Sequence, residues 1–307
     1  MPSTKDLKKR ITSVKNTQQT TRAMKMVSAA KLRRAQEAIV NERPYAKRAG
    51  ELIHQVLSIA SGDEKATAGL SKSPLIRKEG EAGVGKKKVL LVLVSSDRGL
   101  CGGFNSSIIK AAQRWDQGNR DRYASVAFGF VGRKAYDYFK TRKSALGPYY
   151  SELGGKVSFE KAKKLVDSLI EHYLSGEADE VKFIYNEFKN AATQRVVVED
   201  FLPLQPDAVE GAPAATAESV SYILKPSYRD VLEQLLDRHF AIQAFRVLLE
   251  SQASEHGARM SAMENATKNA GEMIRKLTLQ YNKQRQAGIT KELLEIIAGS
   301  ESQKDLH

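Results

Sequence analysis

Cysteine is the scarcest feature of this 307-residue chain, which contains Cys101 alone. A single cysteine excludes an internal disulfide and any metal site built from several cysteines. No apolar run approaches the roughly 20 residues that a membrane-spanning helix needs, so we expect no bilayer crossing. The first residues lack the apolar core and the small-residue cleavage site of a secretory signal, and Asp6 with the helical pattern after it argues against a transit peptide.

Histidine is also sparse, and its five positions form no H-E-x-x-H pattern. His239 and His256 fall on a helical seam, where a polar residue more often adjusts register than binds a metal. The carboxylates are dispersed along predicted helices, without an assembled acid–base pair. The residues therefore predict no catalytic group, no metal site and no cofactor.

Proline and glycine are nearly missing from both ends of the chain. Residues 3–59 contain one of each, Pro44 and Gly50, and no proline follows Pro226. Because helix-forming residues dominate, we predict a helix of about 40 residues up to Pro44 that continues after a kink. A second helix over Ser227–Ile297 would be on the order of 105 Å long. A bundle of short helices would need frequent turn signals, which these segments lack.

A heptad pattern runs along the C-terminal segment. Ten of its fourteen positions are apolar, which favours a coiled coil. These positions are Leu235, His239, Ile242, Arg246, Leu249, Ala253, His256, Met260, Met263, Thr267, Ala270, Ile274, Leu277 and Tyr281. The N-terminal segment starts on a similar seam at Leu7, Ile11 and Val14 and turns polar over 18–22. A long helix with a partly polar seam needs a partner, so we predict that the two terminal helices pair antiparallel.

The middle of the chain alternates between strand and helix patterns. The predicted strands are Val89–Val94, Ala124–Val131, Val181–Phe188 and Arg195–Phe201, and the predicted helices are Phe104–Trp115, Lys134–Lys140 and Glu160–Leu174. This alternation predicts a small α/β domain with a mostly parallel sheet. Two loose stretches, 61–86 and 206–219, flank it, and the second ends at a short predicted strand, Val220–Leu224.

A Gly-rich turn follows the first predicted strand and opens a helix, where α/β proteins often hold phosphate. Residues 95–105 are S-S-D-R-G-L-C-G-G-F-N, which matches neither G-x-G-x-x-G nor G-x-x-x-x-G-K-[ST], and no lysine follows the glycines. We therefore interpret it as a structural turn rather than a nucleotide site. Cys101 beside Arg98 fits an activated thiolate, but no histidine lies nearby in the sequence, which disfavours catalysis.

The net charge of +13 is concentrated at the N-terminus. Residues 1–59 hold thirteen Lys or Arg against four Asp or Glu, whereas residues 227–299 hold ten against nine. The N-terminal segment should attract an acidic partner, which could be nucleic acid, anionic lipid or an acidic protein surface. A nucleic-acid interface should interleave aromatic residues. None precedes Tyr45, which disfavours nucleic acid.

Three separated motifs resemble the gamma subunit of bacterial-type F-type ATP synthases. The first spans Asp6 to Lys31, the second is S-D-R-G-L-C-G-G-F-N at 96–105, and the third spans Ser254 to Gly299, with A-T-K-N-A at 266–270. The resemblance implies an α/β fold class: a long antiparallel two-helix coiled coil formed by the N- and C-terminal segments, plus a central Rossmann-like α/β domain. The expected parts are an N-terminal coiled-coil helix at 1–60, a linker at 61–86, the α/β domain at 87–226 and a C-terminal coiled-coil helix at 227–307.

The same resemblance implies a central-stalk rotor subunit that couples proton-driven c-ring rotation to ATP synthesis at the catalytic beta subunits, without an active site or cofactor of its own. The implied partners are the alpha and beta subunits of the catalytic ring, the epsilon subunit and the c-subunit ring, with no nucleic acid. Membrane association would come only through the complex, at the cytoplasmic face of a bacterial inner membrane. The mitochondrial matrix side is less favoured.

Individual residues match contact positions of that family. The implied contacts with the catalytic ring are Arg10, Met24, Lys25, Arg33, Arg34, Arg259, Arg285, Gln286, Thr290 and Glu292. Tyr222 and Lys225 match the foot region that contacts epsilon and the c ring. The competing interpretation is an enzyme that uses the Gly-rich turn of the α/β domain to bind a nucleotide. Titration of the purified domain with ATP and NAD would detect such binding.

Overall fold

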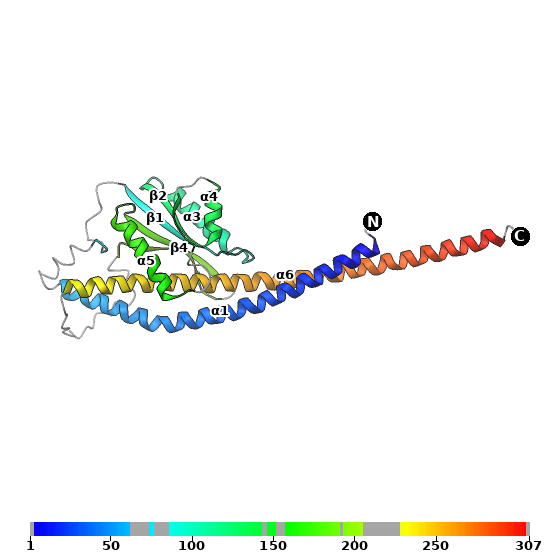
Figure 1. The fold of residues 1–307 in the computed structure, drawn as a ribbon, viewed down its shortest axis with the longest axis horizontal. Coiled ribbons are helices and arrows are strands. Elements are labelled where there is room, and N and C mark those ends of the chain that lie inside the picture. The colour runs from blue at the N-terminus through cyan, green and yellow to red at the C-terminus, as the bar shows by residue number, and fades with distance from the viewer. Residues whose placement is uncertain are drawn as a thin grey trace. The chain divides into compact units, whose positions relative to one another are not determined.

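The computed structural model describes residues 3–61, 74–76, 86–142, 146–151, 157–190, 193–204 and 228–304. Its elements in order are α1 (Thr4–Ser61), β1 (Lys87–Val94), α3 (Phe104–Asn119), β2 (Tyr123–Val131), α4 (Arg133–Lys140), β3 (Leu146–Tyr150), α5 (Phe159–Leu174), β4 (Glu180–Phe188), β5 (Gln194–Leu202) and α6 (Tyr228–Lys304) (Figure 1). Two long terminal helices and a strand–helix segment between them in the chain confirm the predicted fold class.

The chain divides into two compact units, Met1–Ser28 with Met260–His307 and Ala29–Arg259. Both α1 and α6 contribute to each unit. The sequence-based boundaries at 60, 86 and 226 stay a prediction. Most of the loose segment 61–86, all of 206–219 and the predicted strand Val220–Leu224 lie outside the described residues.

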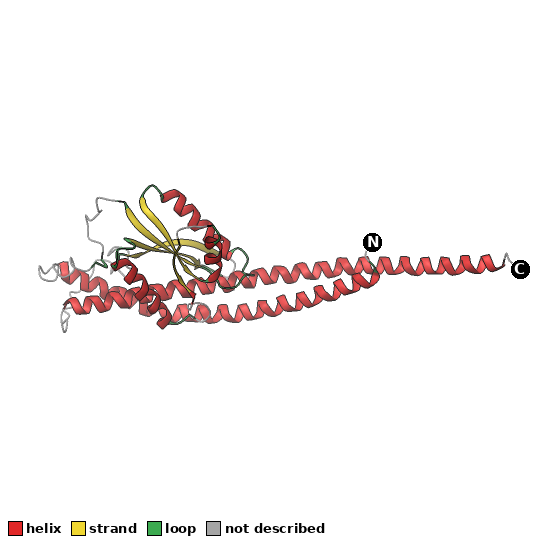
Figure 2. Cartoon of the chain, turned by 45° about the horizontal axis from the view of Figure 1, so that its top comes forward, coloured by secondary structure: helices red, strands yellow, loops and turns green. Residues whose placement is uncertain are grey.

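The strands form one five-stranded sheet in the order β3-β2-β1-β4-β5. The sheet is drawn in yellow in Figure 2. β1 is parallel to β2 and β4, β2 is parallel to β3, and β5 is antiparallel to β4. The prediction of a mostly parallel sheet is therefore confirmed. β3 was not predicted, because its sequence L-G-P-Y-Y contains the two residues most typical of turns. Proline is tolerated there because β3 lies at the edge of the sheet.

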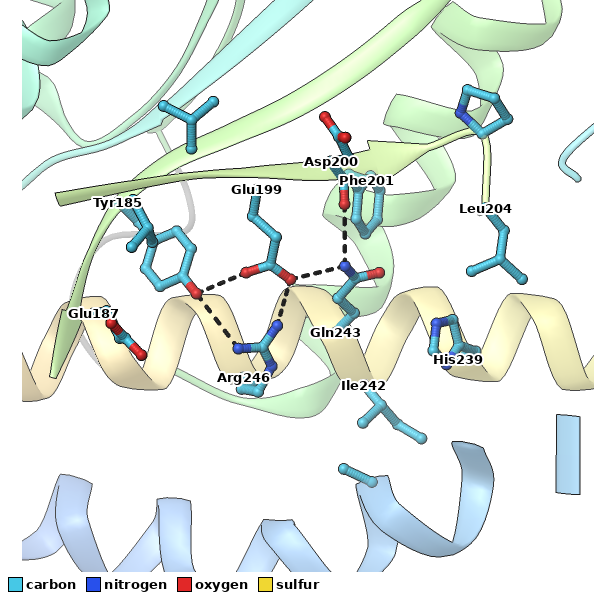
Figure 3. Close-up of a pocket in the computed structure, with 14 residues that line it drawn as sticks. Tyr185, Glu187, Glu199, Asp200, Phe201, Leu204, His239, Ile242, Gln243 and Arg246 are labelled. Carbon is cyan, nitrogen blue, oxygen red and sulfur yellow. Dashed lines mark hydrogen bonds and ion pairs between the residues drawn. The ribbon is translucent and has the colours of Figure 1, made fainter. Parts of the chain in front are cut away.

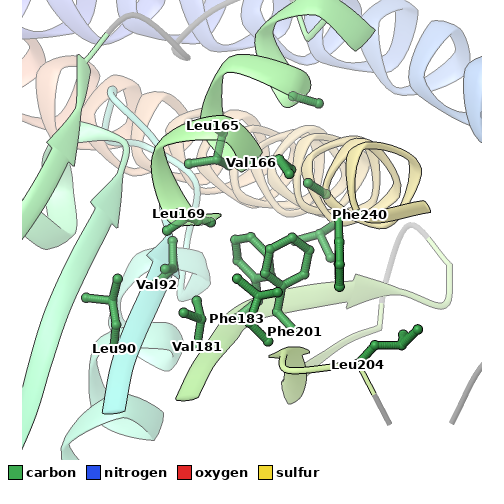
Figure 4. Packing of buried hydrophobic residues seen from close by; sticks show 14 of the residues in the cluster. Leu90, Val92, Leu165, Val166, Leu169, Val181, Phe183, Phe201, Leu204 and Phe240 are labelled. Atoms are coloured by element: carbon green, nitrogen blue, oxygen red, sulfur yellow. The ribbon is translucent and has the colours of Figure 1, made fainter. Parts of the chain in front are cut away.

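Both faces of the sheet are covered, which explains the continuous apolar run of β1. Leu90, Val92 and Val94 pack on the face that carries α5 and α6, and the alternate residues of β1 pack on the face that carries α3 and α4. On the first face Phe201 lies edge-on to Phe183 and Phe240, with ring centroids 4.8 Å and 5.3 Å apart (Figure 4). Such aromatic pairs add stability beyond their buried area, so α6 is part of the domain core.

α1 runs as one helix of 58 residues with Pro44 inside it, which confirms the predicted continuation past the proline. It starts with a reciprocal cap: Asp6 N donates to Ser3 Oγ (3.2 Å) and Ser3 N donates to Asp6 Oδ2 (3.3 Å). This capping box satisfies amides that the first helical turn leaves unpaired. The less exposed positions of α1 recur in steps of four and three from Leu7 to Ile53.

All fourteen predicted heptad positions of α6 are buried or half-buried. Two of them contact the sheet domain: Arg246 pairs with Glu199 of β5, and Leu235 packs against the core on the face that carries α5. Within the unit made by the two helix ends, Thr21 contacts Thr267, and the later Lys25 contacts the earlier Glu264. This order shows that the two helices run antiparallel, as predicted.

Candidate functional site

The Gly-rich turn after β1 is held by its own side chains. Ser96 Oγ donates to the Arg98 carbonyl (2.7 Å), and Asn105 Nδ2 donates to Ser96 Oγ (2.8 Å). Leu100 and Gly102 adopt positive φ values of 66° and 57°, which close the turn. Cys101 is 2% exposed, so its thiol is shielded from solvent and does not have the exposure expected of a reactive cysteine.

At the N-terminus of α4, next to this turn, backbone amides donate hydrogen bonds to side chains of the same chain. Asp97 Oδ1 accepts from Arg133 N (3.0 Å), and Ser95 Oγ accepts from Ala135 N (3.1 Å). A phosphate at a helix N-terminus uses such free amides, and here they already have partners. Gly132 is required beside them because its φ is +91° and a Cβ would lie 2.1 Å from the Ser95 carbonyl oxygen.

A second ligand position of α/β sheets lies where the strand order reverses. Here that point is at the carboxyl ends of β1 and β4, and we call it the switch-point crevice. α6 lies in it: Ser251 Oγ donates to the Val94 carbonyl (3.4 Å) and Ser254 Oγ to the Asn186 carbonyl (2.9 Å). The position of a ligand is therefore occupied by a helix of the same chain, which supports the interpretation of the Gly-rich turn as structural.

Arg259 joins α6 to the Gly-rich turn. Its Nη2 donates to the carbonyls of Arg98 and Gly99, at 3.4 Å each, and its Nη1 lies 2.6 Å from Glu255 Oε1. The Arg259 side chain is only 11% exposed. The structure thus places this predicted ring contact mainly in an internal network.

His256 lies next to Arg259 and is buried. Burial, followed by the positive charges of Arg259 and Lys31, lowers the pKa of His256 to about 4. Burial raises the pKa of Glu255, and the charge of Arg259 opposes that shift. His256 is therefore neutral at physiological pH, which disfavours a role as a charged contact.

We expect His256 to make the chain acid-sensitive. Because its pKa is lower in the folded state than in the unfolded state, the unfolded state binds the proton first as pH falls through the window from 6.5 to 4. Between about pH 7 and about pH 5, the wild type should lose about 2 kcal/mol more unfolding free energy than His256→Gln. Urea unfolding of the full chain, followed by the fluorescence of its single tryptophan, Trp115, measures this.

The comparison with His256→Gln isolates the contribution of His256 to the pH dependence. The raised pKa values of Glu250 and Glu255 make the folded state more stable as pH falls, and they do so in both proteins. Equal losses in wild type and variant would contradict the assignment.

A pocket of about 410 Å³ lies among α1, β4, β5 and α6 (Figure 3). At its centre Glu199 accepts hydrogen bonds from Tyr185 Oη (2.7 Å) and Gln243 Nε2 (2.9 Å) and forms an ion pair with Arg246. Burial raises the pKa of Tyr185, so its hydroxyl remains a donor. These polar groups bind one another. The pocket therefore connects β4 and β5 to α6 and is not an assembled reaction centre.

Polar residues also interrupt the seam between the two helix ends. Thr21 Oγ1 lies 2.8 Å from Thr267 Oγ1, and Gln18 Nε2 donates to the Thr267 carbonyl (3.4 Å). Lys25 Nζ lies 2.6 Å from Glu264 Oε1, with the Lys25 side chain 37% exposed. Polar seam residues fix register in coiled coils. Lys25, a predicted ring contact, is thus partly engaged within the coiled coil.

The remaining predicted contacts are on helix surfaces. Arg10 and Arg34 are exposed on α1, Met24 is half-buried, and Arg33 makes an exposed ion pair with Glu37 at 3.2 Å. The last four are all exposed on α6, namely Arg285, Gln286, Thr290 and Glu292. Tyr222 and Lys225 lie outside the described residues.

Sequence reasoning missed an apolar surface near the end of α6. Its members are exposed by 49% to 68%: Ile289, Leu293, Leu294, Ile296 and Ile297. Exposed apolar surface of this kind marks an interaction site. The signal was present in the sequence, because the predicted heptad ends at Tyr281 while apolar residues continue beyond it.

The described residues contain no cluster of three or more His, Cys, Asp or Glu side chains suited to a metal ion. Over the same residues, no helix combines the length and apolar character needed to cross a membrane.

Comparison with known proteins gives consistent matches. A family model described as ATP synthase matches residues 3–302. The ATP synthase gamma chain of Anaeromyxobacter sp. (strain Fw109-5) is 47% identical over 306 residues, covering 99% of this chain and 100% of that protein. The gamma chain of Geotalea uraniireducens (strain Rf4) is 47% identical over 304 residues, with the same coverage.

Two solved structures are also similar. A chain from the central stalk and c ring of the Tetrahymena thermophila mitochondrial ATP synthase has 26% identity and a TM-score of 0.57, covering 80% of this chain and 99% of that chain. A chain from the rotor of the Euglena gracilis mitochondrial ATP synthase has a TM-score of 0.60 at 19% identity, covering 93% and 98%. The second likeness concerns the fold alone.

Proposed function

Since the chain belongs to the ATP synthase gamma chain family, we propose that it is the central-stalk rotor subunit of an F-type ATP synthase. It couples proton-driven rotation of a c ring to ATP synthesis at the catalytic beta subunits. The observation that carries this proposal is the match to gamma chains along almost the whole chain. The likeness to a central-stalk chain of the Tetrahymena thermophila enzyme supports it.

The subunit acts mechanically and has no active site of its own. At the N-terminus of α4, the amides of Arg133 and Ala135 are bound to Asp97 and Ser95 rather than free for a phosphate. α6 is bonded to the end of β4 at the switch-point crevice. The c ring turns the foot of the rotor, and the eccentric coiled coil then moves each catalytic site through its binding states in turn.

The partners are the alpha and beta subunits of the catalytic ring, the epsilon subunit and the c ring. The residues at 1–60 and 227–307 form the coiled-coil shaft, 61–86 the linker, and 87–226 the domain that carries the foot. The contacts with the catalytic ring are Arg10, Met24, Lys25, Arg33, Arg34, Arg259, Arg285, Gln286, Thr290 and Glu292, and the foot contacts are Tyr222 and Lys225. The exposed apolar end of α6 supports enclosure of that end by other subunits.

The complex places the chain at the cytoplasmic face of a bacterial inner membrane as a peripheral subunit. The bacterial origin of its gamma-chain relatives supports this location.

Purification of the tagged chain with its native partners tests the proposal. We expect the membrane fraction to yield the chain together with alpha, beta, epsilon and c subunits, with ATP hydrolysis in the complex. The chain expressed alone, without those subunits, should not hydrolyse ATP. Recovery of the chain without any alpha or beta subunit, or turnover by the pure chain, would contradict it.

A further inference from the structure

The switch-point crevice opens because two neighbouring strands part. β1 and β4 are paired as far as Leu93 and Ile184. Among the described residues, the end of β1 then pairs with β2 alone, through Val94 and Val131, and the end of β4 with β5 alone. Carbonyls at the parting point therefore need other partners, because a buried unpaired carbonyl is costly.

Two serines of α6 supply those partners. Ser251 is 4% exposed and bonds to the last residue of β1, whereas Ser254 is fully buried and bonds to Asn186 near the end of β4. Asn186 Nδ2 in turn donates to the Phe104 carbonyl of α3 (3.3 Å). One short stretch of α6 is thereby bonded to both strands and, through Asn186, to a helix on the opposite face of the sheet.

These two hydroxyls differ from others on the long helices. Thr12, Thr20 and Thr278 donate to the carbonyl four residues earlier in their own helix, which is the ordinary arrangement for a helical hydroxyl. Ser251 and Ser254 direct their hydroxyls to the sheet. Apolar contacts of α6, such as those of Val247 and Leu248, are non-directional and oppose separation from the sheet more than rotation over it. Hydrogen bonds depend on angle and oppose rotation.

We propose that Ser251 and Ser254 are positioning residues that lock the rotational setting of α6 against the sheet, so that torque passes between the α/β domain and the shaft without slack. The proposal rests on the proposed rotor function. Under load, the helix is held by directional bonds to the ends of β1 and β4, and the load spreads through Asn186 to α3.

The test uses the assembled complex with a bead attached through Lys110→Cys, an exposed position of α3. The angular fluctuation of the bead, with the catalytic ring fixed and stalled, reports the torsional stiffness of the rotor. The double variant Ser251→Ala/Ser254→Ala should raise the angular variance by up to about twofold, because two directional bonds are lost. The apolar packing and the bonds of Gln243, Arg246 and Arg259 to β5 and the Gly-rich turn stay in place. ATP hydrolysis without load should stay close to that of the parent.

Ser106→Ala is the matched control, since Ser106 lies on the exposed surface of the same domain and donates within its own turn to the Gly103 carbonyl (3.0 Å). Its variance should equal that of the parent. If the double variant does not assemble, Ser254→Cys keeps the shape with a weaker donor and should give a smaller rise in variance.

A merely structural role would lower the yield or melting temperature of the complex and leave the variance of assembled molecules unchanged, and that result would overturn the proposal. Failure of the unsubstituted chain to assemble with catalytic subunits would instead overturn the proposed function, so the two failures are distinguishable.

Discussion

A disulfide between Ala30→Cys in this chain and a cysteine in the facing segment of one beta subunit is expected to abolish proton-driven ATP synthesis, and reduction is expected to restore it. Ala30 is exposed on α1, between the buried Ser28 and Leu32. A rotor must change its neighbours during turnover, whereas a static spacer need not. The loss should follow the fraction of complexes that are linked, measured by non-reducing gels beside synthesis in energised vesicles.

Cys101→Ser in the same background leaves one thiol in this chain. The matched control is a link through Lys291→Cys, whose side chain is 78% exposed near the end of α6. The loss of ATP synthesis caused by that link should be smaller, because the last helical turns can fray and rotate around single bonds. Full proton-driven synthesis with the Ala30 link intact would contradict the rotary function.

Arg246→Met is expected to lower the unfolding free energy of the full chain by about 3 kcal/mol. The Arg246 and Glu199 side chains are 25% and 24% exposed, and Arg246 also lies 3.6 Å from Glu250. Removing the Arg246 cation leaves the Glu199 and Glu250 carboxylates without their positive partner in a partly desolvated site. Because the side chains are partly exposed, the expected loss is at the low end of the range for breaking a buried ion pair. Urea unfolding followed by Trp115 fluorescence measures the change.

Two variants control for this effect. Glu199→Gln combined with Arg246→Met should recover part of the loss, because one of the stranded charges is gone. Arg33→Ala removes an exposed pair, with side chains 82% and 61% exposed, and such pairs contribute little. If Arg246→Met costs no more than Arg33→Ala, the network in the pocket does not hold β5 to α6.

The sequence was sufficient for the elements whose signals are local. The scarcity of proline and glycine predicted α1 and α6, and the apolar run Val89–Val94 predicted a central strand. β3 was missed because Gly147 and Pro148 are typical of turns. Its strand geometry comes from pairing with β2, which is a tertiary effect.

The site was predicted less completely, for a related reason. Nothing local distinguishes Ser251 and Ser254 from any other helical serine, since their partners are β-strand carbonyls far away in the sequence. The same holds for Arg259, whose charge suggested an external contact and whose hydrogen bonds are internal. The individual contacts with the catalytic ring stay predictions, because they depend on other chains.

The core on the face of the sheet that carries α5 combines residues from the middle of the chain with residues of the C-terminal helix α6. This arrangement has a consequence for biosynthesis. Ser251 and Val94 are 157 positions apart, and Leu232, Leu236 and Phe240 complete the face of the sheet that carries α5. A ribosome therefore releases β1 and α5 long before the residues that cover them exist. Until α6 emerges, that apolar face is open to aggregation or to a chaperone. The domain consequently finishes folding only near the end of translation, and an excised fragment limited to residues 87–226 would keep this exposed face.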